Sequence, residues 1–173
     1  MLPFPYGVTS LFTYQAGGGR NYPNNNGKPE LLSTISQWSE QRYGVVTDPD
    51  TQVMVLNGTR EGLFNAAVAL CPEDKNGTPC VLIPNPFYPV YGVASASVAA
   101  TPIYLPATQA TGHLPDFRAI SPDVLYRTAI AYMCSPANPQ GTVADEAYWK
   151  DLLELAETYD FRIFSDECYS EIY

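Results

Sequence analysis

The sequence predicts an α/β fold in which helices flank a mostly parallel β-sheet. Short apolar runs of strand length alternate along the chain with longer segments of helical periodicity. Several of these runs are apolar at consecutive positions rather than at every second one. That pattern is typical of parallel strands whose two faces are both covered by helices.

The first predicted elements follow a loop. Residues 16–29 are rich in glycine, asparagine and proline, which indicates an extended loop. Apolar residues at helical spacing then predict a helix over Glu30–Tyr43, with Gly44 as its stop. A strand over Val53–Leu56 and a helix over Arg60–Leu70 come next.

The remaining elements continue the alternation. A strand is predicted over Cys80–Pro84, a helix near Val90–Val98 and a strand over Ile103–Leu105. Residues 106–123 are proline-rich and predict a long surface loop with at most a short helical turn. The last predicted elements are a strand, a helix and a strand, over Thr128–Cys134, Glu146–Tyr159 and Phe161–Ser165.

Composition excludes several classes of partner. The chain has 173 residues, 46% of them hydrophobic, and a formal net charge of −9, so we expect one soluble domain or part of one. The negative charge argues against nucleic acid and against an anionic membrane surface as partners. The start of the chain has no basic leader, and no apolar run approaches the roughly 18 residues of a membrane span.

The cysteines indicate a reducing compartment. None of them has C-x-x-C spacing, and each lies in or beside an apolar segment, so we expect buried free thiols, no zinc site and a cytoplasmic location. They are Cys71, Cys80, Cys134 and Cys168.

Ligands of parallel sheets gather at the carboxyl ends of the strands, so the residues that follow each strand are candidate site residues. After Val53–Leu56, Gly58 makes a turn that opens a helix, whose free amides suit an anion such as phosphate. The alternative is that Gly58 only makes the turn and Thr59 caps the helix.

Two further strand ends carry candidate ring contacts. Tyr88 lies between two prolines that stiffen the backbone, and it either stacks on a flat ligand or packs in the protein. In the segment after Cys134, Pro139 restricts Asn138 to extended conformations and Gly141 allows the chain to turn away. We expect Asn138 to be presented rigidly.

Asp166 follows the last apolar strand and is expected to be at least partly buried. A buried carboxylate needs a partner such as a metal or a cation, or a structural salt bridge. A metal is not expected, because convergent ligands are missing and His113, the single histidine, lies in the proline-rich loop.

Four segments, NGTREGLF, PNPFYPVY, CSPANPQG and SDECYSEIY, resemble in order and spacing those of the class I and II aminotransferases, which use pyridoxal 5′-phosphate (PLP) and have the aspartate-aminotransferase fold. The resemblance is closest to bacterial N-succinyl-diaminopimelate aminotransferases of lysine biosynthesis. It implies a partial PLP-binding large domain over residues 22–173, a remnant of an N-terminal arm over 1–21, and an amino acid and a 2-oxo acid as substrates.

The resemblance also implies roles for individual residues. Asp166 would pair with the protonated pyridine nitrogen, and Asn138 and Tyr169 would hydrogen-bond the phenolic oxygen of the ring. Tyr88 would stack on the ring face. The turn at Gly58 and the amides of Thr59 and Arg60 would hold the phosphate. Tyr22 would reach the phosphate bound in the neighbouring subunit, which implies a homodimer.

Family catalysis also uses a Schiff-base lysine, normally in an S-x-S-K segment beyond the D-E-x-Y strand. Lys28, Lys75 and Lys150 lack the flanking pattern and are expected at the surface. We therefore expect a fragment, inactive in isolation, of a PLP aminotransferase. Alternatives are another PLP enzyme of the same fold, a lyase or synthase, and a noncatalytic truncated product.

Overall fold

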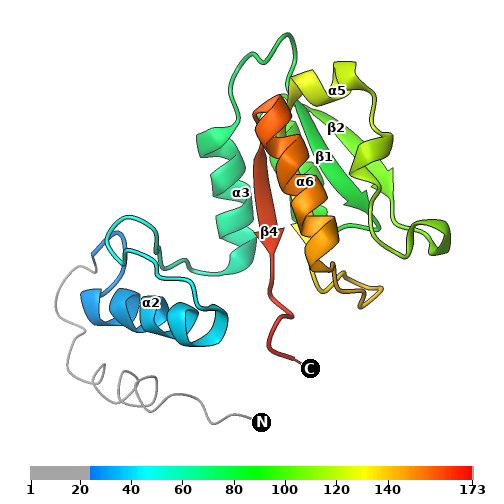
Figure 1. Cartoon of the computed structure of the whole chain (residues 1–173). Coiled ribbons are helices and arrows are strands. Elements are labelled where there is room, and N and C mark those ends of the chain that lie inside the picture. Colours follow the sequence, from blue (N-terminus) through cyan, green and yellow to red (C-terminus); the bar gives the residue numbers. More distant parts are fainter. Residues whose placement is uncertain (1–23, 173) are drawn as a thin grey trace. The chain divides into compact units, whose positions relative to one another are not determined.

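The computed structural model describes residues 24–172 (Figure 1). The chain divides into two compact units, one ending at Leu56 and one beginning at Asn57. Each unit is described by itself.

The first unit contains one helix in its described part. Helix α2 spans Pro29–Tyr43, and Gly44 ends it in the left-handed conformation at φ 70°, where its N–H donates to the carbonyl of Glu40 at 2.9 Å. Gly27 has φ +108°, and a Cβ there would lie 2.8 Å from a methyl carbon of Val55. Glycine at position 27 therefore allows this loop to pack closely on Val55.

The predicted strand over Val53–Leu56 is wrong. These residues are assigned to no strand, and the N–H of Val55 donates to the carbonyl of Asn26 at 3.2 Å. A strand requires a continuous ladder with a neighbour. No neighbouring strand pairs with Val53–Leu56 among the described residues, and the apolar pattern of these four residues carries no information about pairing.

The second unit is built on a four-stranded sheet in the order β2-β1-β3-β4, with every pair parallel. The central strands β1 (Cys80–Asn85) and β3 (Thr128–Cys134) are almost entirely buried. The edge strands are β2 (Thr101–Pro106) and β4 (Arg162–Asp166). Asp166 is thus the last residue of its strand.

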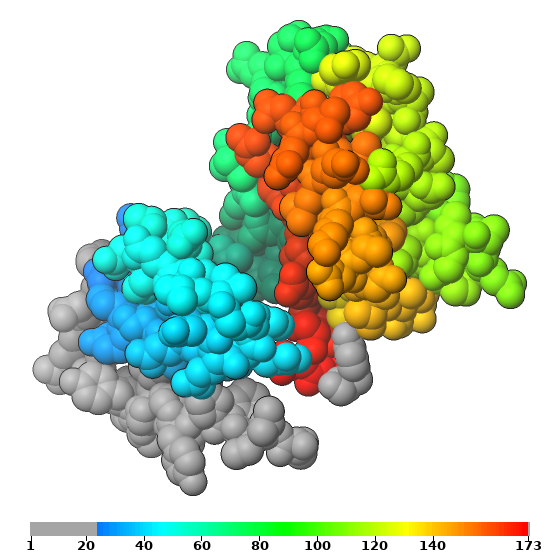
Figure 2. All heavy atoms as spheres, viewed as in Figure 1, coloured from blue at the N-terminus to red at the C-terminus, as the bar shows by residue number. Residues whose placement is uncertain are grey.

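Helices cover both faces of this sheet, which confirms the predicted α/β class. Helices α3 (Thr59–Leu70) and α4 (Pro89–Ser97) pack on one face, around Val81 and Ile83. Helices α5 (Pro122–Arg127) and α6 (Glu146–Tyr159) pack on the other face, around Leu82. Figure 2 shows α6 and the loop before α5 covering this second face.

The loop over residues 106–123 contains more structure than predicted. It forms two 3₁₀ turns, η2 (Gln109–Thr111) and η3 (Phe117–Ala119), and its end begins α5 at Pro122, a short helix that the sequence did not predict. The hydroxyl of Tyr148 on α6 donates to the carbonyl of Pro115 at 2.6 Å and fixes the loop to the helix.

Two expectations about side-chain burial need correction. All four cysteines are free, but only Cys80 and Cys134 are buried, whereas Cys168 is exposed. Lys75 is less exposed than expected, because its side chain is only 14% exposed and its ammonium group donates to the carbonyl of Asp160 at the end of α6. Within residues 24–172, no helix is long and apolar enough to cross a membrane.

Candidate active site

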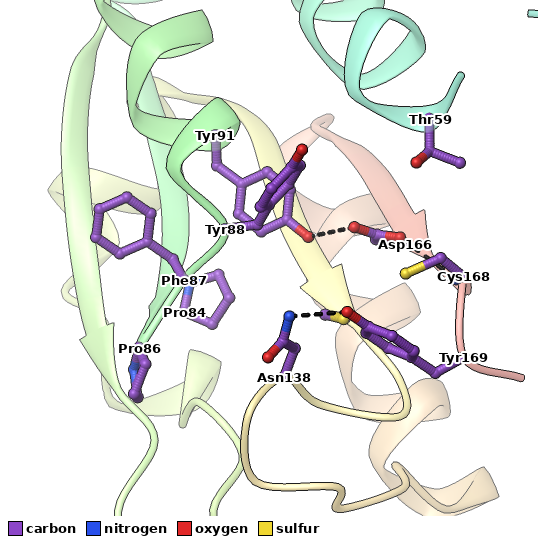
Figure 3. A pocket seen from close by; sticks show the side chains of 11 residues that line it. Thr59, Pro84, Pro86, Phe87, Tyr88, Tyr91, Asn138, Asp166, Cys168 and Tyr169 are labelled. Atoms are coloured by element: carbon purple, nitrogen blue, oxygen red, sulfur yellow. Dashed lines mark hydrogen bonds between the residues drawn. The ribbon is translucent and has the colours of Figure 1, made fainter. Parts of the chain in front are cut away.

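The carboxyl ends of β1, β3 and β4 meet the N-terminal end of α3 around a cavity of about 200 Å³ (Figure 3). Five of the residues singled out in the sequence line it, and they come from four separate segments. The lining residues are Thr59, Pro84, Pro86, Phe87, Tyr88, Tyr91, Cys134, Asn138, Asp166, Cys168 and Tyr169.

Asp166 lines this cavity and is buried, with 6% of its surface exposed. Oxygen Oδ2 accepts a hydrogen bond of 2.6 Å from the hydroxyl of Tyr91, and Oδ1 accepts a longer one of 3.4 Å from the amide of Cys168. Among the described residues it forms no ion pair, so the alternative of a structural salt bridge does not hold there, and its protein partner is the neutral phenol of Tyr91. Oδ1 remains the freer oxygen.

Tyr91 was not singled out in the sequence. Its ring stacks on that of Tyr132 with 4.4 Å between centroids and 12° between planes, and the hydroxyl of Tyr132 donates to the carbonyl of Leu63. Burial raises the pKa of Tyr91 far above its ordinary value, and the hydrogen bond to Asp166 adds to the effect. Tyr91 therefore stays protonated and donates throughout the physiological range.

Tyr88, the N-cap residue of α4, lines the cavity three residues before Tyr91 and is half-buried. The two rings meet edge to face, with 5.9 Å between centroids. The hydroxyl of Tyr88 accepts a hydrogen bond of 2.6 Å from Nε of Arg60. The i, i+3 spacing of the two tyrosines was the signal in the sequence that both reach one site.

Asn138 and Tyr169 face Tyr88 and Tyr91 across the cavity (Figure 3). The amide nitrogen of Asn138 donates to the hydroxyl oxygen of Tyr169 at 2.9 Å. The loop that carries Asn138 is closed by a hydrogen bond from the N–H of Gly141, at φ 74°, to the carbonyl of Ala137. This closure holds Asn138 at the strand end.

The N-terminal end of α3 is not capped by a side chain. Gly58, at φ 147°, is the N-cap residue, and Thr59 is the first residue of the helix rather than its cap. The alternative in which Thr59 caps the helix is therefore wrong. The first amides of α3 are open to an anion, and the helix dipole favours negative charge there.

Two thiols of the cavity were also missed as site residues. Burial raises the pKa of Cys134 to about 11, and burial followed by the hydrogen bond to Asp166 raises the pKa of Cys168. Both thiols are therefore neutral near pH 7. Gly58 and Arg60 adjoin the cavity without lining it, and Tyr22 lies outside the described residues.

The family model for aminotransferases of class I and II matches residues 10–173. The chain belongs to this family. Class I and II aminotransferases are PLP-dependent enzymes.

Individual aminotransferases agree with this membership. An LL-diaminopimelate aminotransferase of Dehalococcoides mccartyi is 38% identical over 152 residues, which cover 87% of this chain and 38% of that enzyme. An aminotransferase structure from Neisseria meningitidis superposes with a TM-score of 0.87 at 34% identity, covering all of this chain and 44% of that one. A probable N-succinyldiaminopimelate aminotransferase from Thermus thermophilus gives a TM-score of 0.79 at 26% identity, covering 95% of this chain and 44% of that one.

The chain thus spans about two fifths of the length of these aminotransferases. Among residues 24–172, no lysine lines the cavity. Lys150 pairs with Glu146 on the exposed side of α6, and Lys75 lies against the end of the same helix.

Proposed function

We propose that this chain forms the PLP-binding part of a longer aminotransferase, which passes an amino group between an amino acid and a 2-oxo acid. The observation that carries the proposal is the convergence of Asp166, Tyr88, Asn138 and Tyr169 with the open end of α3 on one cavity. This donor set fits PLP, since it offers a carboxylate, an aromatic face, hydroxyl and amide groups, and free helix amides. When bound, PLP supplies an electron sink for the bond that breaks at the substrate α-carbon.

Asp166 would hold a proton on the pyridine nitrogen through Oδ1. Tyr91 supports this role, because its short hydrogen bond occupies Oδ2 and orients the carboxylate. On the opposite side, the hydroxyl oxygen of Tyr169 accepts a hydrogen bond from Asn138, and its proton would be donated to the phenolic oxygen of the ring. Tyr88 would cover the ring face.

The phosphate would lie at the N-terminal end of α3, held by the amides of Thr59 and Arg60 beyond the turn at Gly58. Tyr22 would reach the phosphate of the neighbouring subunit in a homodimer. We further propose that residues 22–173 are part of the PLP-binding large domain and that residues 1–21 belong to an N-terminal arm.

For the substrate, we propose a diaminopimelate, free or N-succinylated, in lysine biosynthesis in the cytoplasm. The named relatives support this assignment, since their names specify LL-diaminopimelate and N-succinyldiaminopimelate. The free thiols of the described cysteines fit a reducing compartment.

The test uses the complete enzyme, meaning the gene product with the segments that its relatives have beyond these residues. It is loaded with PLP and assayed with diaminopimelate or its N-succinyl derivative as donor and 2-oxoglutarate as acceptor. We expect amino transfer that depends on the 2-oxo acid. PLP binding without such transfer would favour a lyase or synthase, and absence of PLP binding would refute the proposed function.

The thiol of Cys168 provides a test of the PLP site that needs no turnover. At ten times the dissociation constant of PLP, alkylation of Cys168 by iodoacetamide should slow by about 10-fold, because only the ligand-free fraction reacts. The reaction should accelerate as the pH rises from 7, since the raised pKa of Cys168 keeps the thiolate scarce at neutral pH. Peptide mass spectrometry measures both effects.

Cys71 is the internal control for this experiment. It lies at the opposite end of α3 and is half-buried, so PLP should not change its rate of alkylation. Equal protection of both cysteines would indicate a global change in the protein instead of a ligand over Cys168.

Replacing Gly58 with alanine should weaken PLP binding by about 10-fold, since a side chain at φ 147° is strained by roughly 1–3 kcal/mol and shifts the first amides of α3. A Cβ at this position meets no atom within 4 Å, so the effect comes from backbone conformation and not from a clash. Titration with PLP and with pyridoxal, which has no phosphate, measures the effect.

The loss should be confined to PLP, because the affected amides would bind the phosphate. Gly112→Ala is the matched control, since it also has a positive φ of 63° and open space but lies in the turn after η2. Equal weakening of PLP and pyridoxal by the Gly58 variant would place the phosphate elsewhere.

A further inference from the structure

Arg60 occupies an electrostatically unfavourable position without a compensating ion pair. It is the second residue of α3, where the positive end of the helix dipole disfavours a cation. Among the described residues it pairs with no carboxylate, and its partner is the neutral hydroxyl of Tyr88. A cation in the first turn of a helix that no carboxylate neutralises indicates that function, and not stability, requires it there.

The contact with Tyr88 fixes the guanidinium in a useful orientation. Nε donates to the Tyr88 hydroxyl at 2.6 Å, and Cζ lies 5.7 Å from the centre of the Tyr88 ring. The two terminal nitrogens of the guanidinium form no hydrogen bond with residues 24–172, and they lie in one plane, the geometry that binds a carboxylate through two parallel hydrogen bonds. The anchored side chain is therefore prepared for an oxyanion.

The position of the Arg60 guanidinium relative to the cavity determines which part of a bound substrate it could contact. Tyr88 lines the cavity and is half-buried, whereas Arg60 does not line it and is exposed, so the guanidinium that binds the Tyr88 hydroxyl lies on the solvent side of that ring. The reacting α-carbon must lie inside, near the cofactor ring. A cation on the solvent side of Tyr88 is suited to a charge that the substrate carries further along its side chain.

We propose that Arg60 binds a carboxylate on the side chain of the amino acid substrate and thereby determines specificity for donors with a second acidic group. The inference rests on the proposed function and adds to it the residue that recognises the second carboxylate of the substrate. The cofactor phosphate is a second oxyanion that the same guanidinium could bind, so the experiment must separate the two.

Diaminopimelate and lysine form the decisive pair of donors, since they differ only in the distal carboxylate. In the complete PLP-loaded enzyme, Arg60→Gln should lower the ratio of kcat/KM for diaminopimelate to that for lysine by about 10- to 100-fold, the usual effect of losing a charged hydrogen-bonded pair. Arg60→Lys keeps the charge without the planar fork and should recover part of the ratio.

Arg118→Gln is the matched control and should leave the ratio unchanged, because Arg118 lies in η3 and its guanidinium pairs with Asp151 and Glu154 of α6, outside the cavity. The PLP dissociation constant is measured for each variant. An unchanged ratio in Arg60→Gln, with weaker binding of PLP but not of pyridoxal, would assign Arg60 to the phosphate and overturn the proposal. Absence of transfer from any donor in the wild type would instead refute the proposed function, and this inference with it.

Discussion

Replacing Asp166 with alanine should lower kcat of the complete enzyme by about 10³-fold, the magnitude typical of removing a preorganised group that stabilises developing charge. Asp166 is buried and already oriented by Tyr91. A water molecule in the place of the lost carboxylate carries no negative charge, so it would stabilise the protonated ring nitrogen much less. Single-turnover rates at saturating PLP measure this loss separately from any change in cofactor affinity. Some PLP should remain bound through the phosphate contacts.

Two further variants make this test specific. Asp166→Asn keeps the shape of the side chain without its charge and should lose nearly as much activity. Glu167→Ala removes the neighbouring exposed carboxylate, which accepts a hydrogen bond from Ser165, and should change kcat little. An Asp166→Ala enzyme that kept a tenth of its activity would show that the carboxylate does not hold the ring nitrogen's proton.

Replacing Tyr91 with phenylalanine should lower kcat by about 10- to 100-fold. A hydrogen bond to a buried charged group contributes about 1.5–3 kcal/mol, and the variant leaves Oδ2 of Asp166 without its short donor. Phenylalanine preserves the stack on Tyr132, so the melting temperature should change little while kcat falls. Steady-state kinetics and thermal unfolding of the same preparations separate the two.

The same variant has a signature at high pH. The folded state raises the pKa of Tyr91 above its ordinary value of 10.0, so above about pH 10 the unfolded chain loses a proton that the folded chain keeps. The free energy of unfolding should therefore fall as the pH rises above about 10, and it should fall less steeply in Tyr91→Phe. Tyr126→Phe, at an exposed tyrosine of α5, should retain the wild-type slope.

Local patterns were sufficient to predict most elements of the second unit. β3 and α6 have the predicted bounds, because β3 is an uninterrupted run of buried residues and α6 combines apolar residues at helical spacing with a definite start, where Asp145 accepts a hydrogen bond from the amide of Tyr148. Val53–Leu56 shows the limit of this reasoning, since a strand depends on a neighbour as well as on its own residues. Helix α5 was missed because six residues carry too little periodicity.

The candidate site was predictable in position but not in its internal contacts. Strand-end reasoning singled out Asp166, Asn138 and Tyr88, which line one cavity. The partner of Asp166 was not predictable, because Tyr91 lies 75 residues earlier and reaches Asp166 only when α4 has packed on the face of the sheet. Lys75 was misplaced for the same reason, since its burial depends on the end of α6.

The aromatic rings of Tyr88, Tyr91, Tyr132 and Phe164 form a continuous series from the cavity into the core. Tyr132 and Phe164 do not line the cavity, yet their volumes set the position of the ring that orients Asp166. Efforts to alter the substrate range of the complete enzyme should therefore include the buried Tyr132 and the partly buried Phe164 in their mutant libraries. A library restricted to the cavity wall would leave the orientation of the key carboxylate unexplored.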